Sequence, residues 1–148
     1  MYQLKQLPED FIVNEIIDVP LSESGDFSYF VLKKTDYATP AAVEKIAKFM
    51  HAPIKSIGYA GTKDRHAVTT QWISIEGPET KLSGFSDSNI SLEFKGKGNK
   101  KIYLGMLEGN QFEITIRNTL EKPTPIDKFL NLFDEQRFSM KMLRLEDI

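Results

Sequence analysis

A short polar segment between two apolar runs holds the residues best suited to chemistry. In the stretch YAGTKDRHAVTTQW, Gly61 permits a sharp turn, and Asp64 follows it between the cations Lys63 and Arg65. Two adjacent positive charges favour the ionised carboxylate, which can serve as a nucleophile or as an electrostatic anchor at neutral pH. Aspartate is also a common turn residue, so the same residues describe a polar turn with both cations in solvent. The residues alone favour the turn.

A second polar segment, FKGKGNKK at 94–101, carries four lysines and two glycines without an acid. A solvated hairpin loop is the ordinary interpretation of such a cluster, and a loop that contacts phosphate is the alternative. The net charge of the chain is −2, which argues against a partner held only by bulk electrostatics. The lysines of this segment are Lys95, Lys97, Lys100 and Lys101.

The length and composition of the chain indicate one globular domain. With 41% hydrophobic and 27% charged residues, the 148 residues (1–148) are enough for one core and short for two. No apolar run approaches about 18 residues and the N-terminal segment lacks an apolar signal-peptide core, so neither a membrane span nor export is expected. The absence of cysteine excludes disulfides and thiolate metal sites, and His51 and His66 match no familiar metal-binding spacing. We therefore expect a cytoplasmic protein without a metal.

Hydrophobic periodicity predicts the elements that position these polar segments. Two segments, 39–50 and 124–133, begin with Thr-Pro and continue with apolar residues at helical spacing, which predicts two helices. The strands predicted from alternation and from flanking turn residues are 11–17, 27–34, 56–61, 69–75, 89–94, 101–107 and 111–118, with EGN as a tight turn between the last two. This order of elements favours an α+β domain whose mostly antiparallel sheet carries the helices on one face.

Four segments resemble, in the same order along the chain, the motifs of the TruD family of tRNA pseudouridine synthases. GYAGTKDRHAVTTQW at 58–72 resembles the family's active-site motif, in which a glycine, a lysine, the nucleophilic aspartate and a basic residue follow one another. PEDFIVNEI at 8–16 resembles the family's opening strand. LGMLEGNQFEI at 104–114 resembles its leucine-glycine, then glycine-asparagine-x-phenylalanine segment, and NLFDEQRFS at 131–139 resembles its later glutamine-arginine-phenylalanine segment.

This resemblance implies a role for each matching residue. Asp64 matches the catalytic aspartate, Phe11 a phenylalanine that contacts the substrate, and Asn110 an asparagine that binds the target nucleotide. Without the resemblance, Phe11 would be a core residue of a strand and Asn110 a turn residue. The lysines of 94–101 occupy a region that is basic in relatives, so they become expected contacts to the RNA backbone. The other residues placed among the substrate contacts, without a chemical role, are Phe112, Lys63 and Arg65.

The activity implied by the resemblance is the isomerisation of a uridine, at position 13 of tRNA, to pseudouridine. The reaction breaks the N-glycosidic bond, turns the base and rejoins it through carbon 5, without redox change or an external reactant. No cofactor and no metal are therefore expected. An extruded uridine must be held by aromatic stacking and by polar contacts to its edge, which suit Phe11 and Asn110. A non-catalytic RNA-binding module with the same fold is the alternative.

Family members are longer than this chain, so the resemblance covers the N-terminal portion of the catalytic domain. A family-specific inserted domain and the second half of the catalytic sheet are absent from the sequence. In the last motif, Leu130, Leu132 and Ser139 replace a proline, a tyrosine and a glycine. Half of a sheet exposes an edge that can pair with another chain. We therefore expect an incomplete form, or an enzyme completed by a homodimer or by a second chain.

Overall fold

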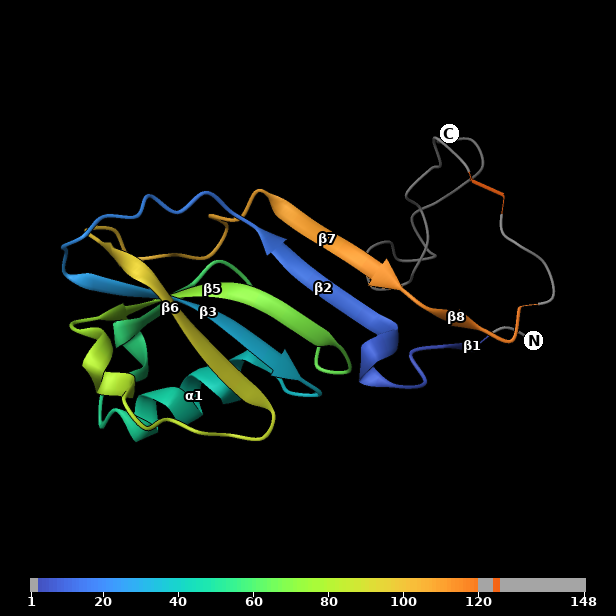
Figure 1. Cartoon of the computed structure of the whole chain (residues 1–148), viewed down its shortest axis with the longest axis horizontal. Helices are drawn as coiled ribbons and strands as arrows, with labels where there is room; N and C mark the ends of the chain where they lie inside the picture. The colour runs from blue at the N-terminus through green and yellow to red at the C-terminus, as the bar shows by residue number, and fades with distance from the viewer. Residues whose placement is uncertain (1–2, 120–123, 126–148) are drawn as a thin grey trace, which may run out of the picture.

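The protein is built around one six-stranded sheet, seen in a computed structural model that describes residues 3–119 and 124–125 (Figure 1). The strands are β1 (Gln3–Leu4), β2 (Phe11–Ile16), β3 (Phe27–Thr35), β4 (Ile57–Tyr59), β5 (Val68–Glu76), β6 (Ile90–Gly98), β7 (Gly109–Ile114) and β8 (Ile116–Arg117). The helices of the described residues are the α-helix α1 (Thr39–Phe49) and the short 3-10 helices η1 (Pro8–Asp10), η2 (Ile54–Ser56) and η3 (Glu79–Leu82).

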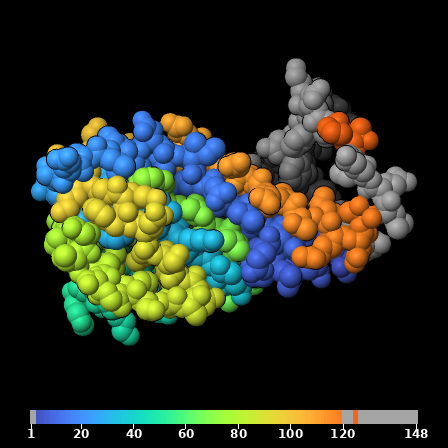
Figure 2. All heavy atoms as spheres, viewed as in Figure 1, coloured from blue at the N-terminus to red at the C-terminus, as the bar shows by residue number. Residues whose placement is uncertain are grey.

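The sheet has the strand order β6-β3-β5-β2-β7, and β4 pairs with β5 beside this path. Its strand pairs are antiparallel except for β2 and β5, which run parallel and pair over 12–14 and 68–70. Strand β7 lies along the outer side of β2, and β1 and β8 form a separate two-stranded ladder. Figure 2 shows the N-terminal residues in blue beside the orange residues of β7 and β8. The expected α+β class with a mostly antiparallel sheet is confirmed.

Helix α1 covers one side of the sheet, which we call the helix face and define by Phe30, Leu32 and Ile73. The helix is amphipathic, and Pro40 in its first turn fits because that turn needs no backbone donor. Its buried residues are Ala42, Val43, Ile46 and Ala47. On the opposite side of the sheet, a smaller cluster forms around Tyr29, Ala60 and Ile102.

The predicted strand at 101–107 is wrong, because this segment forms no ladder. Ile102 is buried, but its N–H donates to the hydroxyl of Ser74 at 2.9 Å instead of to a strand backbone. Gly105 then adopts a φ of +90°, and Tyr103 and Leu104 are exposed. The Gly105 N–H donates to Ala60 O at 2.8 Å, and Met106 and Leu107 are partly buried, so the segment is an anchored loop and not a strand.

Strand β6 is longer than predicted and includes Lys95 and Lys97, so these lysines lie in a strand and not in a hairpin loop. Gly98 permits the close approach of β6 to β3, because a Cβ there would lie 2.6 Å from the ring of Tyr29. The expected EGN turn is also wrong, since Gly109 already begins β7. The predicted helix at 124–133 lies outside the described residues except for its first two positions. No helix of the described ranges is long and apolar enough to cross a membrane.

Candidate active site

The loop that carries Asp64, residues 60–67, connects β4 to β5 and is fastened to the helix face. We call it the Asp64 loop. Gln71 on β5 donates a hydrogen bond to Gly61 O at 3.0 Å, and its side-chain oxygen accepts one from the Thr39 hydroxyl at 2.9 Å. Thr39 is the first residue of α1, and Ala38 precedes it as the N-cap residue without a side-chain cap. Thr39 joins α1 to this network.

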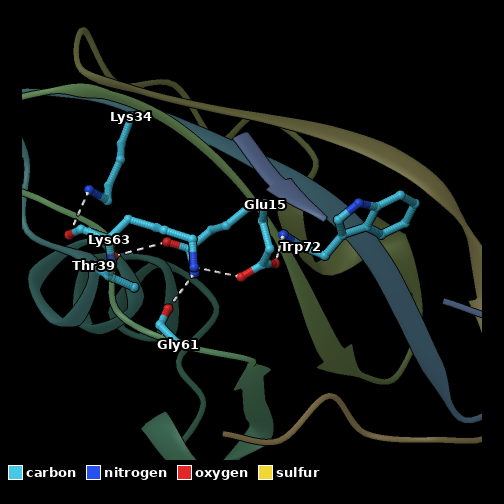
Figure 3. Close-up of polar contacts among 7 residues, drawn as sticks. Glu15, Lys34, Thr39, Gly61, Lys63 and Trp72 are labelled. Carbon is cyan, nitrogen blue, oxygen red and sulfur yellow. Dashed lines mark hydrogen bonds and ion pairs between the residues drawn. The ribbon is translucent and has the colours of Figure 1, made fainter. Parts of the chain in front are cut away.

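Both the backbone N–H and the side-chain ammonium of Lys63 are held by neighbouring residues (Figure 3). Its N–H donates to the Thr39 hydroxyl at 3.0 Å, and Lys63 Nζ lies 2.7 Å from Glu15 Oε1. The two charged side chains are only 4% and 0% exposed. The second carboxylate oxygen of Glu15 accepts the backbone N–H of Trp72 at 2.9 Å. This buried ion pair fastens the Asp64 loop to β2 and β5.

Lys34 approaches the Asp64 loop from β3, and Figure 3 shows its ammonium beside the loop backbone. Lys34 Nζ donates to Asp64 O at 2.8 Å and to Lys63 O at 3.4 Å. The residue is 0% exposed. Burial lowers the pKa of Lys34 to about 8, an effect that the negative charge of Asp64 opposes and the positive charge of Lys63 increases.

The side chain of Asp64 remains accessible, with 52% of it exposed. Its Oδ2 atom lies 3.9 Å from Lys5 Nζ, and the same ammonium lies 3.7 Å from the centroid of the Phe11 ring. One cation therefore joins the candidate nucleophile to the candidate stacking residue. Lys5 adopts a φ of +52°, which is uncommon for a residue with a side chain. Sequence reasoning missed Lys5, because only the fold brings it to Asp64.

Strands β2 and β7 place the aromatic and amide candidates on one side of the sheet. Directly opposed residues of an antiparallel pair share a face, and the register pairs Val13 with Phe112 and Glu15 with Asn110. The rings of Phe11 and Phe112 lie 5.9 Å apart, and Phe112 is 54% exposed. The Oδ1 atom of Asn110 is buried and has no hydrogen-bond partner among the residues that the structure describes. An aromatic pair and an unsatisfied amide oxygen thus lie on the side that carries the Asp64 loop.

Asp10 organises the turn between Lys5 and β2. Its side chain is 2% exposed and accepts the N–H groups of Gln6 and Leu7, each at 3.1 Å. The guanidinium of Arg117 on β8 binds both carboxylate oxygens at 2.6–3.1 Å. Hydrogen bonding to Arg117 holds the pKa of Asp10 below its ordinary value of 3.8. Arg117 near the end of the described domain therefore contacts the N-terminal turn that follows Lys5.

Of the other basic candidates, Arg65 shares the loop with Asp64, and the lysines of 94–101 lie apart from it. Arg65 is exposed on the Asp64 loop. Lys95 pairs with Glu93, and Lys97 pairs with Glu79 at 3.0 Å. The β3–β6 register sets Lys34 opposite Ile90 and Ser28 opposite Lys97, so the lysine segment lies toward the other end of the sheet from Asp64. After β6, Lys101 donates to the backbone of Lys55, and the carbonyl of Lys100 accepts the Tyr29 hydroxyl.

Within residues 3–119 and 124–125, no group of three or more His, Asp or Glu side chains could hold a metal ion. Together, the mostly antiparallel sheet and the exposed aspartate on a loop over its helix face define a domain of the pseudouridine synthase fold.

The family model for tRNA pseudouridine synthase D (TruD) matches residues 2–142, and the chain belongs to this family. The crystal structure of the TruD protein of Methanosarcina mazei superimposes with a TM-score of 0.76 at 38% identity, covering 78% of this chain and 27% of that one. Among curated relatives, tRNA pseudouridine synthase D of Aquifex aeolicus is 39% identical over 150 residues, which cover 92% of this chain and 39% of the relative. A protein of Methanocaldococcus jannaschii named probable tRNA pseudouridine synthase D 2 is 44% identical over 146 residues, 92% of this chain and 34% of the relative. The chain thus spans well under half the length of these relatives.

Proposed function

We propose that this chain is the N-terminal portion of a cytoplasmic tRNA pseudouridine synthase, and that Asp64 is the reacting carboxylate. The observation that carries the proposal is the setting of Asp64. Its backbone is fixed by buried groups, while its carboxylate is half exposed and shares the ammonium of Lys5 with the ring of Phe11. A turn aspartate without a function would need neither the buried fastening nor the adjoining aromatic surface.

The proposed reaction is an isomerisation of a uridine within tRNA, with position 13 as the expected target. The bond between N1 of the base and C1′ of the ribose breaks, and a bond between C5 and C1′ forms. The hydrogen on C5 is lost as a proton and N1 gains one, so atoms and electrons balance without a cofactor. An ionised carboxylate that can reach the sugar and the base is what the reaction requires. The exposed side chain of Asp64 supplies such a group.

A uridine must leave the RNA stack to reach Asp64, and the surroundings of the loop suit an extruded base. Phe11 and Phe112 offer aromatic surface for stacking beside Lys5. We assign the edge of the base to Asn110, whose buried Oδ1 lacks a partner among the described residues and can accept a hydrogen bond from the base. In this assignment, Phe11 on β2 and Phe112 on β7 stack on the base, and Asn110 on β7 contacts its edge.

For the cations we propose different roles. The ammonium of Lys63 is buried against Glu15, which supports a positioning role for Lys63 instead of contact with the substrate. Arg65 is exposed on the same loop and is suited to a phosphate near the target nucleotide. Lys95, Lys97, Lys100 and Lys101 are assigned to more distant phosphates, because they lie toward the other end of the sheet.

We further propose that another chain, a second copy or a separate protein, completes the sheet along β7. The outer side of β7 has no strand partner among the described residues. Phe112 and Ile114 on β7 and Ile116 on β8 are large apolar residues with 44–54% of their surface exposed. Light scattering and chemical cross-linking test this proposal, and a chain that stays monomeric at all concentrations and acts on tRNA alone would contradict it.

The test of function is incubation with unmodified tRNA followed by chemical mapping of pseudouridine. We expect product at one uridine, and loss of product in Asp64→Asn. The matched control is Asp18→Asn, because Asp18 is exposed beyond the end of β2 and belongs to none of the contacts of the site. Salt-sensitive binding of tRNA without product would favour the non-catalytic RNA-binding module.

A further inference from the structure

Lys34 is a buried cation whose ammonium is held by backbone carbonyls. The residue is 0% exposed, and no carboxylate among the described residues lies within ion-pair distance of it. A charged group in such a place is costly unless its hydrogen bonds are satisfied. Lysine here therefore calls for an explanation beyond packing, since an apolar residue would fill the same space without that cost.

The position of Lys34 follows from the alternation of β3. The strand register sets Lys34 between Thr69 on β5 and Ile90 on β6, so the side chain joins the helix face under the Asp64 loop. The preceding residue, Lys33, points to the other side of the sheet and is exposed. Two consecutive lysines of one strand thus have opposite environments.

We propose that Lys34 is a positioning residue that clamps the backbone of Asp64 and whose proton is linked to the charge of that carboxylate. Its ammonium binds the carbonyls of two consecutive residues, Lys63 and Asp64, from beneath the loop. The N–H of Lys63 is held from the other side by Thr39. The backbone around Asp64 is therefore fixed, and its side chain is left to face outward.

The charges that face Lys34 explain the linkage. From the loop, Asp64 stabilises the ammonium and Lys63 destabilises it, while the neighbours on β5 and β6, Thr69 and Ile90, are uncharged. The two loop residues have partners of their own, Lys5 for Asp64 and Glu15 for Lys63. Burial brings the pKa of Lys34 to about 8, so its proton is released in mildly alkaline solution. This inference uses the proposed function only in naming Asp64 as the reacting group.

The experiment is an NMR titration of the whole chain with carbon-13 at the ε position of lysine. We expect Lys34 to titrate near pH 8 and not at the ordinary lysine value of 10.5. The carbonyl resonances of Lys63 and Asp64 should move over the same pH range. In Asp64→Asn the Lys34 midpoint should move to lower pH, whereas the exposed control Asp18→Asn should leave it unchanged. A Lys34 titration midpoint near 10.5, or a midpoint that Asp64→Asn leaves unchanged, would overturn the proposal.

A pair of lysine variants tests the clamp itself. Lys34→Met should release the loop, and the Lys63 amide should exchange with solvent at least about tenfold faster. Lys33→Met removes the same charge from the other side of β3 and should leave this exchange unchanged. Equal effects of both substitutions would refute a specific clamp. If Lys34→Met does not fold, the wild-type titration and the Asp64→Asn shift still decide the question. None of these readouts requires pseudouridine formation, so they fail or succeed separately from the proposed function.

Discussion

Glu15 Oε1 lies 2.7 Å from Lys63 Nζ, with both side chains almost inaccessible to solvent. Replacing one partner leaves the other charge buried and unpaired. We therefore expect Lys63→Met to lower the free energy of unfolding by about 3–5 kcal/mol, as measured by denaturation in urea. The double variant Glu15→Gln with Lys63→Met should recover part of this loss.

The exposed pair of Glu93 and Lys95 on β6 provides the control for this prediction. Lys95→Met removes a lysine from an ion pair in the same sheet, but water screens that pair. Its cost should stay below about 1 kcal/mol. Similar losses for Lys63→Met and Lys95→Met would show that the buried pair does not hold the Asp64 loop.

Lys5 combines contacts to Asp64 and to the Phe11 ring with an unfavourable backbone conformation. Because its φ is +52°, a glycine at this position should relieve strain that an alanine retains. We expect Lys5→Gly to protect the neighbouring Leu7 amide better than Lys5→Ala, by about 1 kcal/mol in hydrogen exchange. Both variants remove the ammonium beside Asp64, so both should weaken uridine binding equally. If alanine protects Leu7 as well as glycine does, the conformation of Lys5 stores no strain.

The buried carboxylate of Asp10 makes the N-terminal turn sensitive to acid. Its pKa is held below 3.8 chiefly by hydrogen bonding to Arg117, so its stabilising effect is present above that value. The effect is lost as the pH falls through the lowered pKa of the folded state. In Arg117→Gln the turn should begin to loosen at a higher pH. The carboxyl NMR resonance of Asp10 and the hydrogen exchange of the Leu7 amide would measure this change. An unchanged Asp10 midpoint in this variant would contradict the assignment.

Lys34 predicts a dependence of the same sign at alkaline pH, where stability again rises with pH. Its pKa is lowered from 10.5 to about 8 in the folded state, so below pH 8 the fold carries the full cost of a buried charge. Between pH 8 and 10.5 the folded protein loses this proton before the unfolded chain does, and stability rises. Relative to Lys34→Met, the wild-type free energy of unfolding should increase by up to about 3 kcal/mol over this range. If the difference in free energy of unfolding between wild type and Lys34→Met stayed constant over this pH range, Lys34 would not titrate there.

Periodicity predicted the elements that bury a face along their whole length. Strands β2, β3 and β5 and helix α1 appear where alternation or helical spacing placed them, whereas the sharp turn expected at Gly61 is not assigned and Gly61 is not among the glycines with a positive φ. The segment 101–107 alternates equally well, yet it forms a loop in which Ile102 is buried and Met106 and Leu107 are only partly buried against the same cluster. Pairing partners and register depend on distant residues, and no local pattern contains them.

The candidate site was predicted only in part for the same reason. Asp64, Phe11 and Asn110 stand in recognisable motifs, whereas Lys5 acquires its contacts from the fold. For Lys34, the sequence contained a signal that could have been used. It continues the inward series of Phe30 and Leu32, so the alternation of β3 already points a lysine at the core. A charged residue in an apolar series deserves the same scrutiny as a motif.

The contact between Asp10 and Arg117 joins positions 107 apart in the chain. Closing so long a loop costs conformational entropy before the contact returns any stability, and contacts of this kind slow folding. During synthesis, β2 can pair with β5 on one side, but its other side has no strand partner among the described residues until β7 has left the ribosome. Pairing of β7 with β2 should therefore be a late event, and a chain cut before β7 would retain the helix-covered part of the sheet without Asn110 and Phe112.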